Sequence, residues 1–358
     1  MAVPIYQGLD FYVPTFEVKL RGSALPRDVI RDVAQVQYRD SVDDIDSFEL
    51  TINNWDADKR EFKYSDKDLF DPGKEVEVQM GYYGGAGLTR MLSGEITSLR
   101  PSFPASGQPT LAVSGLNLLH RFRRRQETHV YEKKTDAQIA QEIAGRLGVP
   151  IEAKGGGEAY EYVLQRNSYD IVFLMERARR IGYDLFVKEE QGQAKLFFQP
   201  STDVRQVTYE LVYGKSLIQF QPNLSTVNQV NRVTLRGWSQ TRGERIEASV
   251  SRSEITSQNV GSEVQDSFSE REEVITDQPV ETEQEARTLA RERLERIAKD
   301  LLTASGSSVG LPELRAGALL EIKGVGKRFS GAYFVTSTTH SIADGGYTTQ
   351  FECRREGK

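Results

Sequence analysis

PGKEVEVQMG (residues 72–81) and RAGALLEIKG (residues 315–324) are two distant stretches of the chain that follow one pattern. In both, apolar and polar side chains alternate, which is the pattern of a half-buried β-strand. Glycine stands near both ends of each stretch, and glycine supplies the backbone geometry that turns require. Each stretch therefore predicts a β-strand with a turn at both ends.

The match between the two stretches covers three strand positions and a later dipeptide. With Gly73 aligned to Gly317, the matching strand positions are Val76/Leu320, Glu77/Glu321 and Val78/Ile322. The dipeptide is Ser-Gly in both copies, at Ser93-Gly94 and at Ser330-Gly331. One interpretation is a duplicated β module that brackets the chain and suits a symmetric partner. The other is that two unrelated β-hairpins share a common pattern.

Composition places the chain among soluble globular proteins. Its 358 residues are enough for two or three domains, and its hydrophobic share of 38% and charged share of 27% are ordinary. No stretch is long and apolar enough to span a bilayer, and MAVPIYQGLD (residues 1–10) lacks both a basic leader and an apolar signal core. We therefore expect a protein made in the cytoplasm.

The residues offer little for catalysis or metal binding. Cys353 is the only cysteine, so neither an intrachain disulfide nor a cysteine-based metal site is available. No GxSxG or HExxH motif occurs, and the abundant carboxylates are expected to be solvated loop acids. His340 is expected to sit at a strand end, hydrogen-bonded to backbone, instead of acting as a ligand or base. We therefore predict no catalytic residues, no cofactor and no metal, and a protein that is not an enzyme.

The order of patterns predicts an α+β fold that is mainly β. Residues 1–120 read as a first antiparallel β-barrel, residues 121–205 as a small α/β domain and residues 206–358 as a second β-barrel. The last domain is expected to contain a polar, exposed insertion at 249–279 and a long charged helix at 282–302. Two related barrels would thus flank the α/β domain.

Two helix starts carry capping-box patterns. Thr135 is followed three residues later by Gln138, and Thr282 is followed by Glu285. In such a box each of the two side chains bonds the backbone N–H of the other residue, which fixes where a helix begins. The first of these helices is expected to end at Gly148, before Pro150.

The sharpest charge feature is HRFRRR (residues 120–125), at the junction of the first barrel and the α/β domain. Its guanidinium groups are suited to an acidic partner surface or to nucleic acid passing nearby. The alternative is a solvated connector whose arginines pair with the chain's own acids. The formal net charge of −6 argues against a general nucleic-acid binder, and we predict no specific nucleic-acid binding. The candidate interface residues are Arg121, Arg123, Arg124 and Arg125.

Four stretches, in this order and spacing, resemble the late control gene D family of phage tail hubs and the hub portion of the valine-glycine repeat spike proteins. Together they cover nearly the whole chain. They are LSGEITSLRP (92–101) with LAVSGLNLLHRFRRR (111–125), VLQRNSYDIVFLMERARRIGYDLFV (163–187), VNQVNRVTLRGW (227–238) and GAYFVTSTTHSIADGGYTTQFECRR (331–355).

The resemblance implies a structural baseplate hub of a contractile phage tail or a related injection particle. Such a hub is a homotrimer whose two barrels per subunit form a ring of six similar units. That ring adapts a hexameric inner tube protein to a trimeric spike protein. The implied partners are further copies of the chain, the tube, a spike on a separate chain and other baseplate components. Assembly into the baseplate would follow synthesis in the bacterial cytoplasm. An alternative is a tail-associated protein that binds or hydrolyses cell-wall peptidoglycan.

The arginine run gives a first testable prediction. A variant with all four arginines changed to Ser should keep its circular dichroism spectrum and melting temperature, because exposed charges contribute little to stability. Its assembly into particles should be impaired, as measured by the yield of particles seen by electron microscopy. A normal particle yield would show that the run is only a solvated connector.

Overall fold

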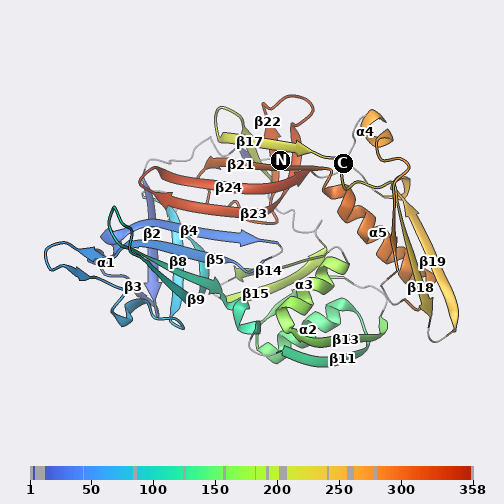
Figure 1. Ribbon diagram of the computed structural model, residues 1–358, viewed down its shortest axis with the longest axis horizontal. Coiled ribbons are helices and arrows are strands. Elements are labelled where there is room, and N and C mark those ends of the chain that lie inside the picture. The colour runs from blue at the N-terminus through green and yellow to red at the C-terminus, as the bar shows by residue number, and fades with distance from the viewer. Residues whose placement is uncertain are drawn as a thin grey trace.

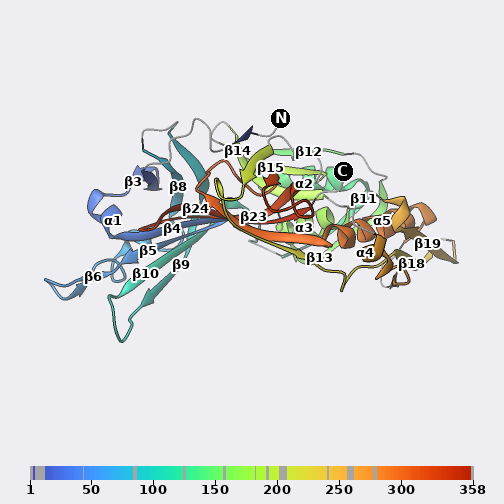
Figure 2. The same cartoon turned by 90° about the horizontal axis from the view of Figure 1, so that it is seen from above.

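The structure is a computed structural model that describes residues 3–4, 13–42, 44–83, 87–123, 126–155, 159–181, 183–190, 193–200, 208–239, 242–255, 262–276 and 280–355. It is mainly β, with two β modules, an α/β unit and a long C-terminal helix (Figures 1 and 2). No helix among the described residues is both long enough and apolar enough to cross a membrane.

The first module is a six-stranded antiparallel sheet in the order β2-β8-β9-β10-β5-β4. It curls around one apolar core, to which alternate residues of each strand contribute, such as Phe48, Leu50 and Ile52 of one strand. The strands are β2 (Pro14–Leu20), β4 (Val33–Ser41), β5 (Ser47–Asn53), β8 (Glu75–Tyr82), β9 (Leu88–Ser102) and β10 (Thr110–Asn117).

The second module repeats this order as β16-β22-β23-β24-β21-β17. It has its own core, which includes Leu320, Ile322 and Phe351. One pair differs from the first module, because β16 runs parallel to β22 where β2 runs antiparallel to β8. The strands are β16 (Thr208–Val212), β17 (Leu217–Leu224), β21 (Leu302–Val309), β22 (Leu319–Lys323), β23 (Gly331–Ala343) and β24 (Gly346–Arg355).

The repeated sequence pattern forms the same structure in both modules. Gly73 and Gly317 both lie in the left-handed region, at φ of 88° and 90°, which favours glycine. Each donates its N–H to a carbonyl of the following long strand, Gly73 to Ile96 at 2.8 Å and Gly317 to Val335 at 2.8 Å. The prediction of two related β modules is therefore confirmed, and the reading as unrelated hairpins is wrong.

The two Ser-Gly pairs do not occupy equivalent positions in the two modules but are offset by two residues. Val76 pairs with Gly94, but its counterpart Leu320 pairs with Tyr333, so Gly331 has no glycine partner in the first module. The two glycines also serve different purposes. A Cβ on Gly94 would lie 2.1 Å from the carbonyl oxygen of Leu116, whereas Gly331 opens its strand at φ of 136°.

The two modules are joined edge to edge. β4 of the first module pairs antiparallel with the second half of β23, from Ser41 opposite Ser337 to Gln35 opposite Ala343. We call this pairing the joint. It creates a continuous path of eight strands, β9-β10-β5-β4-β23-β24-β21-β17, across both modules. In Figure 1, β4 and β23 lie side by side where the blue and red parts of the chain meet.

The α/β unit packs two helices against two small sheets, β11-β13 and β12-β15-β14. The predicted capping box is confirmed, since Gln138 N donates to Thr135 Oγ1 at 3.3 Å and Thr135 N donates to Gln138 Oε1 at 2.9 Å. The helix ends at Gly148, as predicted. The elements are β11 (Gln126–Lys134), α2 (Asp136–Leu147), β12 (Ile151–Ala153), β13 (Tyr160–Tyr169), α3 (Asp170–Arg180), β14 (Tyr183–Glu190) and β15 (Gln193–Pro200).

The long charged helix is also confirmed, as α5 (Glu283–Lys299), with Thr282 accepting from Glu285 N at 3.1 Å. It covers the sheet β19-β18-β20, and together they enclose a separate core. Of the predicted insertion at 249–279, residues 256–261 and 277–279 lie outside the described residues. The elements around it are β18 (Arg232–Ser239), β19 (Glu244–Ser251), η3 (Arg252–Glu254), α4 (Ser262–Asp266) and β20 (Glu272–Ile275).

Short elements complete the chain. They are β1 (Val3–Pro4), β3 (Ser23–Ala24), α1 (Arg27–Asp32), β6 (Trp55–Asp56), β7 (Glu61–Phe62), η1 (Asp68–Phe70) and η2 (Leu118–Arg123). The core of the α/β unit includes Ile45 and Leu119, so it packs directly on the first module. We keep domain boundaries after residues 120 and 205 as a proposal, which limited proteolysis would check.

Glycine substitutions test the turn that begins each repeated strand. Gly73→Ala should destabilise the protein by about 1–2 kcal/mol, because a Cβ is disfavoured at φ of 88°. The matched control is Gly145→Ala within α2, where the new methyl meets nothing within 4 Å and should stabilise the helix by about 0.5–1 kcal/mol. Chemical denaturation would measure both, and equal effects would contradict the role of Gly73.

Candidate assembly interface

One face of the eight-stranded path is polar along its whole width. Strand alternation sends every second residue away from the cores, and these outward residues are mostly Ser, Thr and Gln. We call this surface the polar face. It includes Arg100 of β9, Ser114 of β10, Glu49 and Thr51 of β5, Gln35, Gln37 and Arg39 of β4, Thr339 and Ser341 of β23, Gln350 and Glu352 of β24, Ser305 and Ser307 of β21, and Gln219 and Gln221 of β17.

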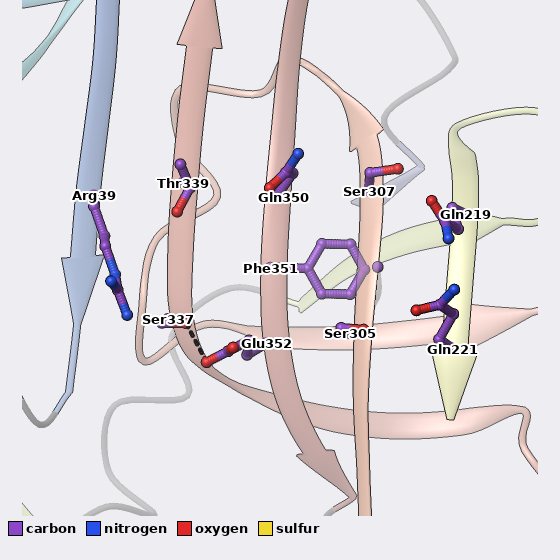
Figure 3. Close-up of a pocket in the computed structure, with 11 residues that line it drawn as sticks. Arg39, Gln219, Gln221, Ser305, Ser307, Ser337, Thr339, Gln350, Phe351 and Glu352 are labelled. Atoms are coloured by element: carbon purple, nitrogen blue, oxygen red, sulfur yellow. Dashed lines mark hydrogen bonds between the residues drawn. The ribbon is translucent and has the colours of Figure 1, made fainter. Parts of the chain in front are cut away.

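The polar face is hollowed over the second module and the joint. A hollow of about 420 Å³ is lined by residues from five strands, β4, β23, β24, β21 and β17. Figure 3 shows Gln219, Gln221 and Gln350 standing on this surface, with Arg39 at its border. The sheet is therefore concave toward its polar side at this place.

Side chains on the polar face contact one another through an ion pair and several hydrogen bonds. Arg100 contacts Glu49, whose carboxylate also accepts from Ser114 Oγ at 3.0 Å. Glu352 accepts from Ser337 Oγ at 2.9 Å, and Gln35 Nε2 donates to Ser341 Oγ at 2.9 Å across the joint. The surface is thus hydrophilic and mostly uncharged among the described residues. Among the described residues, no group of three or more His, Cys, Asp or Glu side chains could hold a metal ion.

On the opposite side of β4 from the polar face, an ion pair between a half-buried arginine and a buried aspartate connects the two modules at the joint. Arg315, from the loop before β22, approaches Asp40 of β4 with Nε 2.7 Å from Oδ2. The same guanidinium lies over the ring of Tyr38 at 4.4 Å and donates to the carbonyl oxygen of Met91 at 3.0 Å. Asp40 also accepts from Ala316 N at 3.2 Å and from Thr338 Oγ1. One arginine thereby connects the second module to two strands of the first.

His340 lies in the interior of β23 and is fully buried, so its predicted place at a strand end is wrong. Its predicted backbone contact is confirmed, with Nε2 2.9 Å from the carbonyl oxygen of Leu314. Because a carbonyl only accepts, Nε2 carries the proton, and Nδ1 accepts from Tyr347 OH at 3.0 Å and Thr349 Oγ1 at 3.1 Å. Burial lowers the pKa of His340 to about 3, so the ring is a neutral structural element.

The candidate arginines fall partly outside the description. Arg123 ends η2 and is exposed. The side chain of Arg121 and the whole of Arg124 and Arg125 lie outside the described residues. Next to them, His120 Nε2 lies 2.9 Å from Glu95 Oε2. The role of the four arginines as an interface stays a prediction.

The sequence interpretation missed the Asp40 and Arg315 pair. A signal for Asp40 was present, because in β4 it has the same parity as Val36 and Tyr38, which face the core. An acid at an inward position requires a buried partner. Arg315 opens one of the two repeated stretches, but nothing in the sequence connects it to a residue 275 positions away.

A family model described as the Alg8 N-terminal domain matches residues 11–344. No curated protein matches the chain.

Solved structures share the fold over nearly the whole chain. The 43 kDa tail protein of prophage MuSo2 from Shewanella oneidensis has a TM-score of 0.71 at 16% identity, over 96% of this chain and 98% of that one. A tail protein from Neisseria meningitidis MC58 has a TM-score of 0.69 at 12% identity, over 96% and 97%. An E. coli type VI secretion component, described as structurally similar to T4 tail proteins, has a TM-score of 0.61 at 14% identity, over 95% and 77%. The sequence resemblance to tail hub proteins is thus confirmed at the level of the fold.

The buried carboxyl of Asp46, which accepts from Tyr38 OH at 3.1 Å, gives a pH prediction. Burial, followed by the nearby charge of Asp40, raises its pKa to about 8. Folding therefore favours the protonated form, so stability is full near pH 4 and declines as pH rises toward 8. Between these pH values the free energy of unfolding should fall by up to about 1.4 kcal/mol per pH unit, and Asp46→Asn should reduce this slope because the amide stays neutral at every pH. Denaturation series at several pH values would measure it, and parallel curves for both proteins would contradict it.

Proposed function

We propose that this chain, which belongs to the Alg8 N-terminal domain family, is a structural protein of a phage tail baseplate or of a related contractile injection particle. The observation that carries the proposal is the repeat of six strands in the same order within one chain, joined into one continuous sheet. The shared fold of the Shewanella and Neisseria tail proteins supports it. The role is assembly, without turnover of a substrate.

In this proposal the chain acts as a homotrimer that adapts two symmetries. Three copies of a chain with two similar modules present six similar units in a ring. Such a ring can meet a hexameric inner tube on one side and a trimeric spike on the other. The small differences between the modules, such as the parallel β16–β22 pair, would mark the face that follows threefold symmetry.

The polar face is suited to line the central channel of this ring. It is the side of the eight-stranded path that no apolar core covers, and the hollow makes it concave. Small uncharged side chains, which make up most of the face, bind passing molecules weakly, and this suits a conduit better than a binding site. The α/β unit and α5 pack outside this path, where other baseplate components would contact them.

Light scattering of the purified protein tests the proposed assembly. The expected mass is three times 40.3 kDa over a range of concentrations, because ring closure satisfies every copy equally. A stable monomer that remains single with tube and spike proteins present would overturn the proposal. Sedimentation with purified peptidoglycan separates the alternative, since a cell-wall protein would bind it as a monomer.

A further inference from the structure

The short connection between β4 and β5 contacts three parts of the chain at once. We call its described residues, Val42 and 44–46, the junction loop. Val42 donates its N–H to Thr336 O of the second module at 2.9 Å. Ile45 belongs to the apolar core of the α/β unit. The backbone carbonyl of Asp46 accepts at 2.8 Å from the N–H of the last residue of β10, in the first module. The loop therefore lies where the two modules and the α/β unit meet.

We propose that Asp46 makes the junction loop a proton-dependent clasp. With its carboxyl protonated, Asp46 holds the loop against the joint, and this is the closed clasp. When the proton is lost, the loop leaves the joint, and the α/β unit is held less firmly on the two modules. The clasp does not depend on ring formation, because every group in it belongs to one chain.

The side chain of Asp46 is turned into the joint and is buried. Its Oδ2 accepts from Tyr38 OH at 3.1 Å, and the carboxyl also accepts from the backbone N–H of Ser41. The Tyr38 hydroxyl in turn accepts from the guanidinium of Arg315. Burial raises the pKa of Tyr38 well above its ordinary value, so this hydroxyl is neutral. Asp46 is therefore connected to Arg315 through a neutral tyrosine and has no direct ion pair with it.

The charges around Asp46 balance only while its carboxyl is protonated. Arg315 and Asp40 are the charged groups that affect it most, and they already pair with each other at 2.7 Å. Asp40 is buried and also accepts from Ala316 N at 3.2 Å. His340, the titratable ring of the joint, stays neutral because burial lowers its pKa to about 3. A charged Asp46 would thus place two buried carboxylates beside one guanidinium, which is costly.

The pKa of Asp46 determines the pH range in which the clasp opens. In the closed clasp, burial and then the charge of Asp40 raise this pKa to about 8. A carboxyl that has left the joint for water has an ordinary pKa of about 4. Opening therefore releases a proton. The equilibrium constant for opening should rise by about tenfold per pH unit between these two values and level off above about pH 8.

Opening of the clasp affects the α/β unit more than the joint. It removes Ile45 from the core that this residue shares with Leu119 and the α/β unit. It also breaks the hydrogen bond from Asn117 N to the carbonyl oxygen of Asp46. The pairing of β4 with β23 remains, because Asp40 keeps Arg315 as its partner. The protein can thus loosen the α/β unit while the eight-stranded path stays intact.

Two other titratable groups lie near the loop and require controls. His120 has Nδ1 3.1 Å from Asn117 O and Nε2 2.9 Å from Glu95 Oε2. Because histidine often changes charge between pH 5 and 8, His120 is the competing source of a pH response. Asp44 is exposed and accepts from Ile45 N at 2.8 Å. Its carboxylate is in contact with water in the closed clasp, so its ionisation does not require opening.

Hydrogen exchange measured by mass spectrometry tests the clasp between about pH 5 and pH 8. Each rate is corrected for the pH dependence of exchange in an unprotected amide. Peptides that contain the amides of Val42 and Asn117 report on the loop, and peptides from the interior of β5 report on the sheet. The loop amides should exchange before the sheet interior does, and their protection should fall by about tenfold per pH unit.

Two variants assign the response to its residue. In Asp46→Asn the protection of the loop amides should be the same at every pH, because the side-chain amide stays neutral and its oxygen can still accept from Tyr38 OH. The matched control His120→Gln should keep the full pH response of the unmodified protein. A pH response that persists in Asp46→Asn would overturn the clasp, and its loss in His120→Gln would assign the response to His120.

The unmodified protein decides the question even if Asp46→Asn fails to fold. Loop amides that exchange only together with the interior of β5 would overturn the clasp, because the pH dependence would then belong to global unfolding. Loop protection that does not change between pH 5 and pH 8 would overturn it as well. Early exchange of the loop that accelerates with rising pH would support it.

Discussion

The pairing of β4 with β23 is the interaction on which the rest of this structure depends. It connects two strands about 300 residues apart and turns two separate modules into one sheet. The ion pair of Asp40 and Arg315 stabilises this pairing, because without Arg315 the buried carboxylate of Asp40 would lose its charged partner. His340, held neutral between Leu314, Tyr347 and Thr349, fills the neighbouring space without adding a charge.

The two modules differ in the segments that connect their corresponding strands. In the first module β4 leads directly to β5 through residues 42–46, whereas in the second module the path from β17 to β21 contains β18, β19, β20 and α5. The α/β unit stands between β10 and β16, outside both sets of six strands. Both additions enclose their own apolar cores, so neither disturbs the repeated strand order. The added units can therefore contact other proteins without changing the repeated sheet.

A sheet with one apolar and one polar face has a simple functional consequence. The apolar faces are covered inside each module, and the polar face remains available along the whole path. In the proposed ring this face lies toward the channel, while tube and spike meet the rims. The mostly uncharged side chains of the face, among the residues described, agree with a surface that lets other molecules pass.

The sequence by itself determined the local features. Alternation of apolar and polar residues predicted strands such as β5. Glycine predicted the turns at Gly73 and Gly317, and the structure gives both residues a positive φ. The capping-box patterns predicted where α2 and α5 begin. These signals act within a few residues, so a sequence carries them completely. The order of these patterns also predicted the mainly β fold class. The two Ser-Gly pairs lie at different positions in their modules because equal dipeptides do not fix register, which depends on the paired strand.

Only the tertiary structure decided which strand edges meet and which stay open. The partner of Asp40 lies 275 residues away, and the place of His340 inside β23 depends on β4 being its neighbour. The polar face exists as one surface only because the joint aligns strands from both ends of the chain. Such contacts depend on the competition among all possible edges for partners, and no short stretch of sequence contains that information.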